Sequence, residues 1–194
     1  MAQNTPQKQS LSRKRVAILV AEGFEQVEMT EPRLALQAAG ARVDIVSPEK
    51  GTVLGFNHLD KADSFKVDIP LDQADAGDYD ALMLPGGVAN PDKLRTLPKA
   101  VAFVRAFFDA GKPVAAICHA PWSLIEADVV RGRTLTSGPS LKTDLENAGA
   151  EWVDREVVVD GQLVTSRKPD DLPAFNPKMT ELFSRAPEPA GARR

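Results

Sequence analysis

The only cysteine of the chain, Cys118, is followed directly by one of its two histidines, His119. A thiolate is a strong nucleophile and a histidine exchanges protons near neutral pH, so this pair can perform nucleophilic or acid–base chemistry. Cys118 follows the short apolar run 113–117, which predicts a strand that turns sharply into a helix. Amides at the start of that helix would favour the thiolate. The alternatives are a buried structural cysteine and a histidine that only helps to start the helix.

Three acidic residues and two glycines are expected near the same place. The first strand–helix turn contains Glu22, Glu25 and Glu28, and a later strand ends at Gly86 and Gly87. A carboxyl group beside the cysteine can move protons or can stay protonated and hydrogen-bond the sulfur. It can also do no more than stabilise the helix terminus by its charge. The residues alone do not choose among the three glutamates.

The elements that position these residues alternate between short apolar runs and helical patterns. Strands are predicted at 15–21, 42–48, 80–87 and 113–117, and helices at 26–40 and 91–112. This order predicts a mostly parallel sheet with helices on both faces, in which sites collect at the carboxyl ends of the strands. Two segments depart from the alternation: an antiparallel excursion at 52–68 and a hairpin at 155–167.

The composition indicates one soluble globular domain. The 194 residues carry a net charge of −3, with 43% hydrophobic and 26% charged residues. We expect a single domain at 14–185 between mobile tails at 1–13 and 186–194. No run is long and apolar enough for a signal peptide or a membrane span, which favours a cytoplasmic protein without membrane contact. The mild charge makes nucleic acid an improbable partner, and one cysteine excludes an internal disulfide.

Several motifs carry a resemblance to a known family. The chain contains, in order, GFEQVE, LPGG, AAICHAPW, TSGPSLKTDLENAGAEWVD and VVVDGQLVTSRKPDDLPAF. Together they resemble the PfpI family of the ThiJ/PfpI superfamily over about residues 15–183. The resemblance implies an α/β fold, a flavodoxin-like three-layer sandwich with a mostly parallel sheet, related to class I glutamine amidotransferases. It also implies Cys118 as the nucleophile, His119 and Glu25 beside it, and oxyanion amides from Gly87 and His119.

The resemblance further implies an assembled site. In oligomeric members an acidic residue after the Pro-Gly-Gly turn reaches the histidine of a neighbouring subunit, and Asp92 is the best match here. A homo-oligomer, a dimer or a hexamer, is therefore expected. The alternative is that Asp92 only favours the start of its helix. Two departures are Ala120, where members commonly have glycine, and Asp92 itself, which is shorter than the glutamate of some relatives.

The resemblance implies a stress-response hydrolase or deglycase that acts on methylglyoxal or its protein adducts. A small dicarbonyl or a glycated protein is then the substrate, and no metal or organic cofactor is required. One alternative is a redox-sensing or chaperone-like stress protein that uses oxidation of Cys118. A weaker alternative is an intracellular cysteine peptidase. Glutamine amidotransferase activity is disfavoured, because the later His-x-Glu pair is absent and the other histidine is His58.

Overall fold

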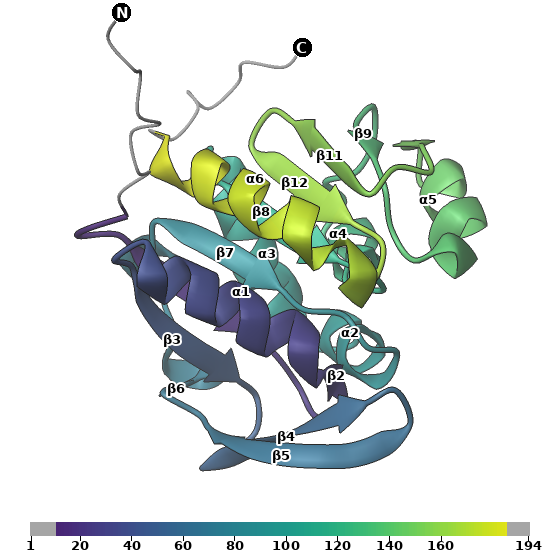
Figure 1. The fold of residues 1–194 in the computed structure, drawn as a ribbon. Coiled ribbons are helices and arrows are strands. Elements are labelled where there is room, and N and C mark those ends of the chain that lie inside the picture. Colours follow the sequence, from purple (N-terminus) through teal and green to yellow (C-terminus); the bar gives the residue numbers. More distant parts are fainter. Residues whose placement is uncertain (1–10, 186–194) are drawn as a thin grey trace, which may run out of the picture.

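The computed structural model describes residues 11–185, and Figure 1 shows its elements. The strands are β1 (Arg15–Leu19), β2 (Phe24–Glu25), β3 (Arg42–Ser47), β4 (Thr52–Asn57), β5 (Asp60–Lys66), β6 (Ile69–Pro70), β7 (Ala81–Leu84), β8 (Val114–Ile117), β9 (Thr134–Leu135), β10 (Glu151–Trp152), β11 (Val157–Asp160) and β12 (Leu163–Ser166). The α-helices are α1 (Gln26–Ala38), α2 (Ala89–Arg95), α3 (Pro98–Asp109), α4 (Pro121–Glu126), α5 (Lys142–Asn147) and α6 (Leu172–Ser184). The 3-10 helices are η1 (Leu71–Gln73), η2 (Ala76–Asp78), η3 (Pro139–Leu141) and η4 (Pro169–Asp171).

A seven-stranded sheet forms the centre, with the order β11-β12-β8-β7-β1-β3-β6. All neighbours pair in parallel except β11 and β12, which form the predicted antiparallel hairpin. The order β3-β1-β7-β8-β12 is the flavodoxin-like order, which reverses direction between β1 and β7. The turns after β1, β7 and β8 therefore meet at one edge of the sheet.

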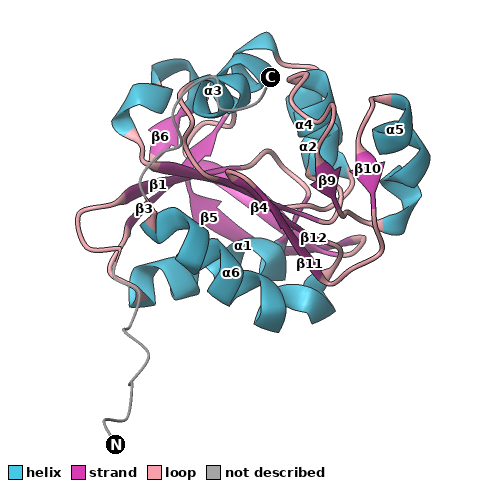
Figure 2. Cartoon of the chain, turned by 90° about the horizontal axis from the view of Figure 1, so that it is seen from above, coloured by secondary structure: helices cyan, strands magenta, loops and turns pink. Residues whose placement is uncertain are grey.

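Helices cover both faces of this sheet, so the predicted three-layer sandwich is confirmed. Figure 2 shows α1 and α6 on one side and α2, α3 and α4 on the other. One apolar core contains Phe175 and Met179 of α6, and the other contains Val104 and Phe107 of α3. Strands β1, β7 and β8 are buried on both faces, which explains why their sequences are continuous apolar runs.

The structure divides the helix predicted at 91–112 into α2 and α3. Leu97 between them has φ −101° and ψ 109°, an extended conformation. The reason is Pro98, which disfavours helical geometry in the residue before it and fits the first turn of a new helix. The predicted excursion at 52–68 contains the antiparallel pair of β4 and β5, to which β2 adds a third strand.

The domain begins earlier than the expected boundary at residue 14. Leu11 is fully buried, and its backbone N–H donates to the carbonyl of Ala39 at 2.8 Å. Leu11 thus joins the core instead of the predicted tail, while Ser12 and Arg13 are exposed. The rest of that tail, 1–10, and the segment 186–194 lie outside the described residues. Of the helices within 11–185, none is both long and apolar enough to cross a membrane.

Candidate active site

Cys118 lies on a strained turn between β8 and α4. Its φ is +62°, a left-handed value that is uncommon for a residue with a side chain. The turn is held by its own backbone: the N–H of Cys118 donates to Ser166 at 3.1 Å, and that of Ala120 donates to Ile117 at 3.1 Å. Ala120 has φ −53°, so the alanine found where relatives commonly have glycine causes no strain. The turn places Cys118 at the carboxyl edge of the sheet, where the residue is half-buried.

The glycine pair after β7 faces this turn. A Cβ on Gly86 would lie 2.6 Å from the Cβ of Cys118 and 2.5 Å from Oε2 of Glu28, so only glycine fits between them. The backbone amides of Gly87 and His119 lie beside the Cys118 thiol and oppose the rise that burial causes in its pKa. These are the two amides expected to form an oxyanion hole.

The glutamate at the sulfur is Glu28. Its carboxyl group is fully buried and accepts the backbone N–H of Gly86 at 2.9 Å, while burial and the charge of Glu28 raise the pKa of the Cys118 thiol. Helix α1 buries Glu28, Pro32 and Leu36 at intervals of four residues, so Glu28 lies on the face that packs against the sheet. This helical periodicity was the sequence signal that could have identified it.

Glu25 occupies a different position from the predicted one. Its Oε2 accepts the backbone N–H of His58 at 3.0 Å and lies 3.7 Å from Nδ1 of the same residue. Glu25 caps the start of α1, where the chain turns its side chain toward the β4–β5 hairpin. Glu22 is exposed. The structure therefore corrects the choice among the three: Glu28, not Glu25, is the carboxyl group beside Cys118.

Burial controls the protonation of the Glu28–Cys118 pair. Burial and, to a smaller extent, the nearby charge of Glu25 raise the pKa of Glu28 to about 8, while the hydrogen bond from the Gly86 amide opposes the shift. Burial also raises the pKa of the Cys118 thiol, with a further contribution from the Glu28 charge, while the Gly87 and His119 amides oppose the shift. The sequence predicted a readily formed thiolate, but it did not reveal that Cys118 is half-buried or that α4 has only six residues.

His119 is held by three neighbours. Its Nδ1 lies 3.0 Å from the Cys118 sulfur and its Nε2 lies 3.1 Å from Oγ of Ser140. The Trp122 ring packs edge-on against it, with the ring centres 5.4 Å apart. Burial lowers the pKa of His119, so its ring is neutral at pH 7. No sequence signal pointed to Ser140, which is 21 residues from His119 along the chain.

Asp92 lies in the first turn of α2 and is exposed. Among the interactions within residues 11–185, none joins its carboxylate to His119. The contact predicted for Asp92 requires a second subunit and stays a prediction.

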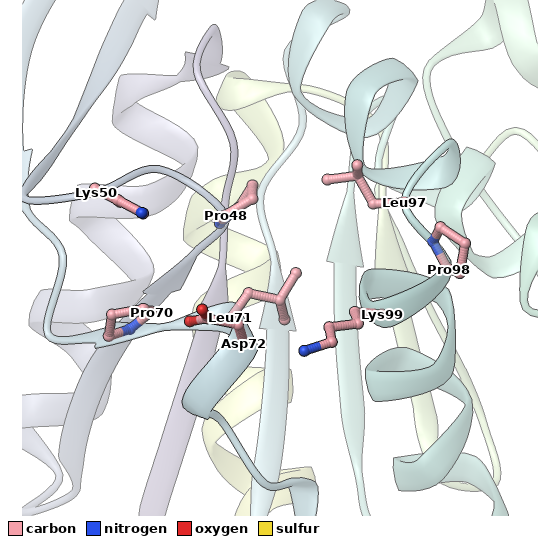
Figure 3. A pocket seen from close by; sticks show the side chains of 8 residues that line it. All are labelled: Pro48, Lys50, Pro70, Leu71, Asp72, Leu97, Pro98 and Lys99. Atoms are coloured by element: carbon pink, nitrogen blue, oxygen red, sulfur yellow. The ribbon is translucent and has the colours of Figure 1, made fainter.

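A cavity of about 380 Å³ lies away from Cys118, and Figure 3 shows the side chains that line it. Its walls include Pro48, Pro70, Leu71, Leu97, Lys50 and Lys99. No cysteine, histidine or glutamate lines it, so its chemistry differs from that of the Cys118 site. Within residues 11–185, no group of three or more His, Cys, Asp or Glu residues is placed to hold a metal ion.

A model described as the DJ-1/PfpI family matches residues 14–182 of the chain. The chain belongs to this family. Among DJ-1/PfpI relatives, Deglycase PH1704 of Pyrococcus horikoshii is 47% identical, over 87% of this chain and 99% of its own. Protein/nucleic acid deglycase 2 of Escherichia coli is 46% identical, over 88% of this chain and 98% of its own.

A solved DJ-1/PfpI structure agrees with the fold. It is a two-domain protein from Anabaena variabilis with DJ-1/ThiJ/PfpI-like and ferritin-like domains, with 34% identity and a TM-score of 0.83. The match covers 93% of this chain and 52% of that protein, so the chain spans about half of its length. Both sequence relatives above are named deglycases, which indicates that this DJ-1/PfpI family contains enzymes.

Proposed function

We propose that the protein is a cysteine-dependent deglycase that hydrolyses methylglyoxal adducts on the amino groups of proteins. The observation that carries the proposal is the surroundings of one sulfur. The buried carboxyl group of Glu28 lies beside Cys118 across Gly86, and Nδ1 of His119 lies 3.0 Å from the sulfur. The backbone amides of Gly87 and His119 lie beside the thiol and oppose the rise that burial causes in its pKa. A nucleophile, a proton carrier and two oxyanion donors thus lie together. The names of two relatives, both deglycases, support this choice of substrate.

The proposed reaction needs only water as a co-reactant. The sulfur of Cys118 bonds to the adduct carbon that carries the amine, the C–N bond breaks, and the amine leaves with a proton. The resulting hemithioacetal loses its C–H proton to Glu28, which returns it to the neighbouring carbon, while its hydroxyl proton passes to the neighbouring ketone oxygen. That transfer oxidises the first carbon to a thioester and reduces the ketone to an alcohol. Water then cleaves the thioester to give lactate and the free thiol.

Glu28 replaces Glu25 as the proton carrier in this scheme. A base works best when its pKa lies near the working pH, and burial raises the pKa of Glu28 to about 8. The amides of Gly87 and His119 stabilise the negative oxygen that forms on the substrate carbon. Free methylglyoxal follows the same route without an amine leaving group.

The decisive experiment compares wild type with Cys118→Ala on a methylglyoxal-modified peptide and on free methylglyoxal. Released amine and lactate are measured together, at several concentrations of a scavenger that removes free methylglyoxal. A deglycase releases both products at a rate that the scavenger does not change, and Cys118→Ala abolishes it. If the amine is released only when the scavenger removes free methylglyoxal, the deglycase proposal is refuted and glyoxalase activity on free methylglyoxal is the remaining explanation. A methylglyoxal-modified nucleotide is a second compound to test in the same assay, because the name of one relative includes nucleic acid.

Redox sensing is the second candidate function. The same amides of Gly87 and His119 that surround the thiol can hydrogen-bond a sulfenate or sulfinate oxygen. Mass spectrometry after limited peroxide treatment separates the two functions. Reversible, stoichiometric oxidation of Cys118 without multiple turnovers on the modified peptide would favour the sensor.

A further inference from the structure

The Nε2 atom of His119 has a partner within the same chain. Ser140 lies in η3, and its Oγ is 3.1 Å from Nε2, while Nδ1 on the other side of the ring lies 3.0 Å from the Cys118 sulfur. The ring of His119 thus connects the thiol to the Ser140 hydroxyl group.

The loop that carries Ser140 is fixed to the cysteine turn. The backbone N–H of Gly138 donates to the carbonyl of Cys118 at 2.8 Å, and Leu141 donates to Gly138 at 3.0 Å. A Cβ on Gly138 would lie 3.4 Å from the His119 ring, so the loop backbone packs directly against it. The position of Ser140 is therefore set by the same backbone that holds Cys118.

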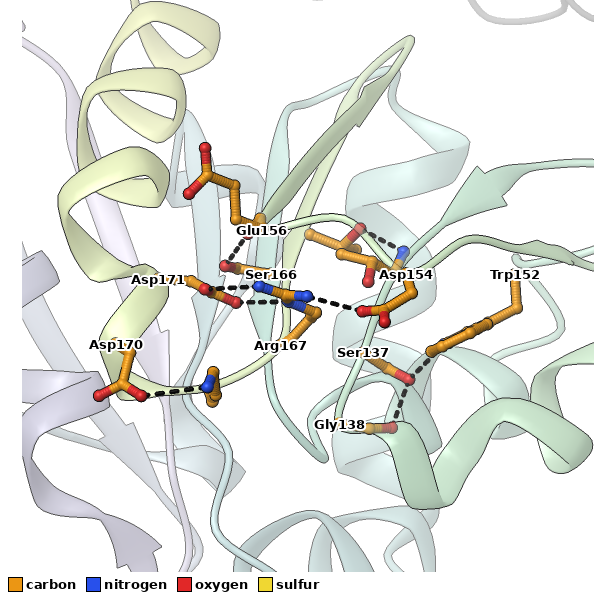
Figure 4. Close-up of polar contacts among 12 residues, drawn as sticks. Ser137, Gly138, Trp152, Asp154, Glu156, Ser166, Arg167, Asp170 and Asp171 are labelled. Atoms are coloured by element: carbon orange, nitrogen blue, oxygen red, sulfur yellow. Dashed lines mark hydrogen bonds and ion pairs between the residues drawn. The ribbon is translucent and has the colours of Figure 1, made fainter.

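A second set of contacts holds the loop from the other side, as Figure 4 shows. Trp152 donates from Nε1 to Oγ of Ser137 at 3.0 Å, and that hydroxyl donates to the Gly138 carbonyl at 2.8 Å. Ser137 is buried and Trp152 is half-buried. These bonds restrict the movement of Gly138, and the contact of Ser140 with His119 is maintained as a result.

We propose that Ser140 is a positioning residue for His119, an inference that rests on the proposed function. A hydroxyl group both donates and accepts, so Ser140 can serve either tautomer of the neutral ring. When Nδ1–H donates to the sulfur, Nε2 accepts from Ser140. When Nδ1 accepts a hydrogen bond from the thiol, Nε2–H donates to Ser140. The ring therefore keeps the same orientation in both neutral tautomers.

This arrangement differs from one completed by a carboxylate. A carboxylate at Nε2 accepts only and stabilises the charged imidazolium, whereas Ser140 adds no charge. Burial already lowers the pKa of His119. The neutral partner keeps the ring uncharged, and any partner-subunit carboxylate has to share or displace the Ser140 contact.

The test uses Ser140→Ala, Ser140→Thr, which retains the hydroxyl group, and Ser64→Ala as a control at an exposed serine. Nitrogen-15 NMR reports the tautomer of His119, and His58 is an internal reference because the chain has two histidines. We expect Ser140→Ala to shift the His119 ring nitrogens and to lower kcat about tenfold without a matching change in KM. Ser140→Thr restores both, and the His58 signals do not move.

A second readout separates this inference from the proposed function. Iodoacetamide labelling of Cys118 needs no substrate, and Ser140→Ala should slow it several-fold across the pH range. Unchanged His119 shifts and labelling rates in Ser140→Ala would overturn the inference, whatever the enzyme turns over. Changed shifts and labelling in a protein without deglycase turnover would support the positioning role and refute the deglycase instead.

Discussion

Cys118 and the carboxyl group of Glu28 meet at Gly86, where a Cβ would lie 2.5 Å from Oε2 of Glu28 and 2.6 Å from the Cβ of Cys118, although 90 positions separate the two residues. Both groups are acids, and burial disfavours the charged form of each. Because the two negative charges would also repel each other, loss of the first proton from the pair makes loss of the second proton harder. Several measurable properties depend on this coupling.

Glu28→Gln should reduce turnover of methylglyoxal or its adducts by about 100-fold or more, because general acid–base groups contribute about that much. Glu25→Gln should cost less than about tenfold, since its carboxylate contacts His58 and affects Glu28 only through its charge. Steady-state kinetics with lactate detection measure both. Equal losses in the two variants would show that the carboxylates act only through their combined charge.

The alkylation of Cys118 should depend on pH in a way that reports the pair. Below the raised pKa of Glu28, about 8, both groups are protonated and the thiolate is scarce. The iodoacetamide rate should therefore rise about tenfold per pH unit up to that value and then level off. A pH series of labelling rates, followed by mass spectrometry, checks this. A plateau that begins below pH 7 would instead indicate the low-pKa thiolate expected from the sequence.

Stability should fall as the pH rises from about 4.5, the ordinary pKa of a glutamate, to about 8, the raised pKa of Glu28. The folded protein keeps the Glu28 proton in this interval and the unfolded chain has lost it, so unfolding releases a proton. The free energy of unfolding then drops by about 1.4 kcal/mol per pH unit from this group. Denaturant titrations across the interval should show a smaller slope in Glu28→Gln, and the exposed Glu22→Gln should keep the wild-type slope.

Gly86→Ala should disrupt the site, because the added Cβ would lie 2.5 Å from Glu28 and 2.8 Å from the carbonyl of Ile117. We expect a loss of about 1–3 kcal/mol in unfolding free energy, typical of overpacking, and a loss of most labelling of Cys118. Gly77→Ala is the control, since its nearest contact is the exposed Asp75 side chain at 3.1 Å. A fully active Gly86→Ala would mean that the glycine pair has room to move.

Assembly should complete the site if Asp92 reaches His119 of another subunit. Asp92→Asn and His119→Ala, made singly and together, should then give non-additive losses of activity. Light scattering should find a dimer or a larger oligomer, consistent with the exposed position of Asp92 on α2. A fully active monomer would refute completion by a second subunit, and additive losses in an oligomer would remove Asp92 from the catalytic contact.

The sequence by itself determined the features that depend on local pattern. Continuous apolar runs identify β1, β7 and β8 because strands buried on both faces need them. The abrupt end of one run at Cys118 indicated the turn that carries the nucleophile. Strand and helix alternation then fixed the parallel sandwich, since parallel neighbours require crossover connections.

Only the tertiary structure decided which side chains meet at the sulfur. Glu25 and Glu28 are three positions apart, and the rotation of α1 against the sheet turns one toward His58 and the other toward Cys118. Ser140 reaches His119 through a loop fixed by backbone bonds that no local pattern encodes. The pKa of the Cys118 thiol likewise depends on burial by distant segments, which reverses the shift expected from the helix terminus alone.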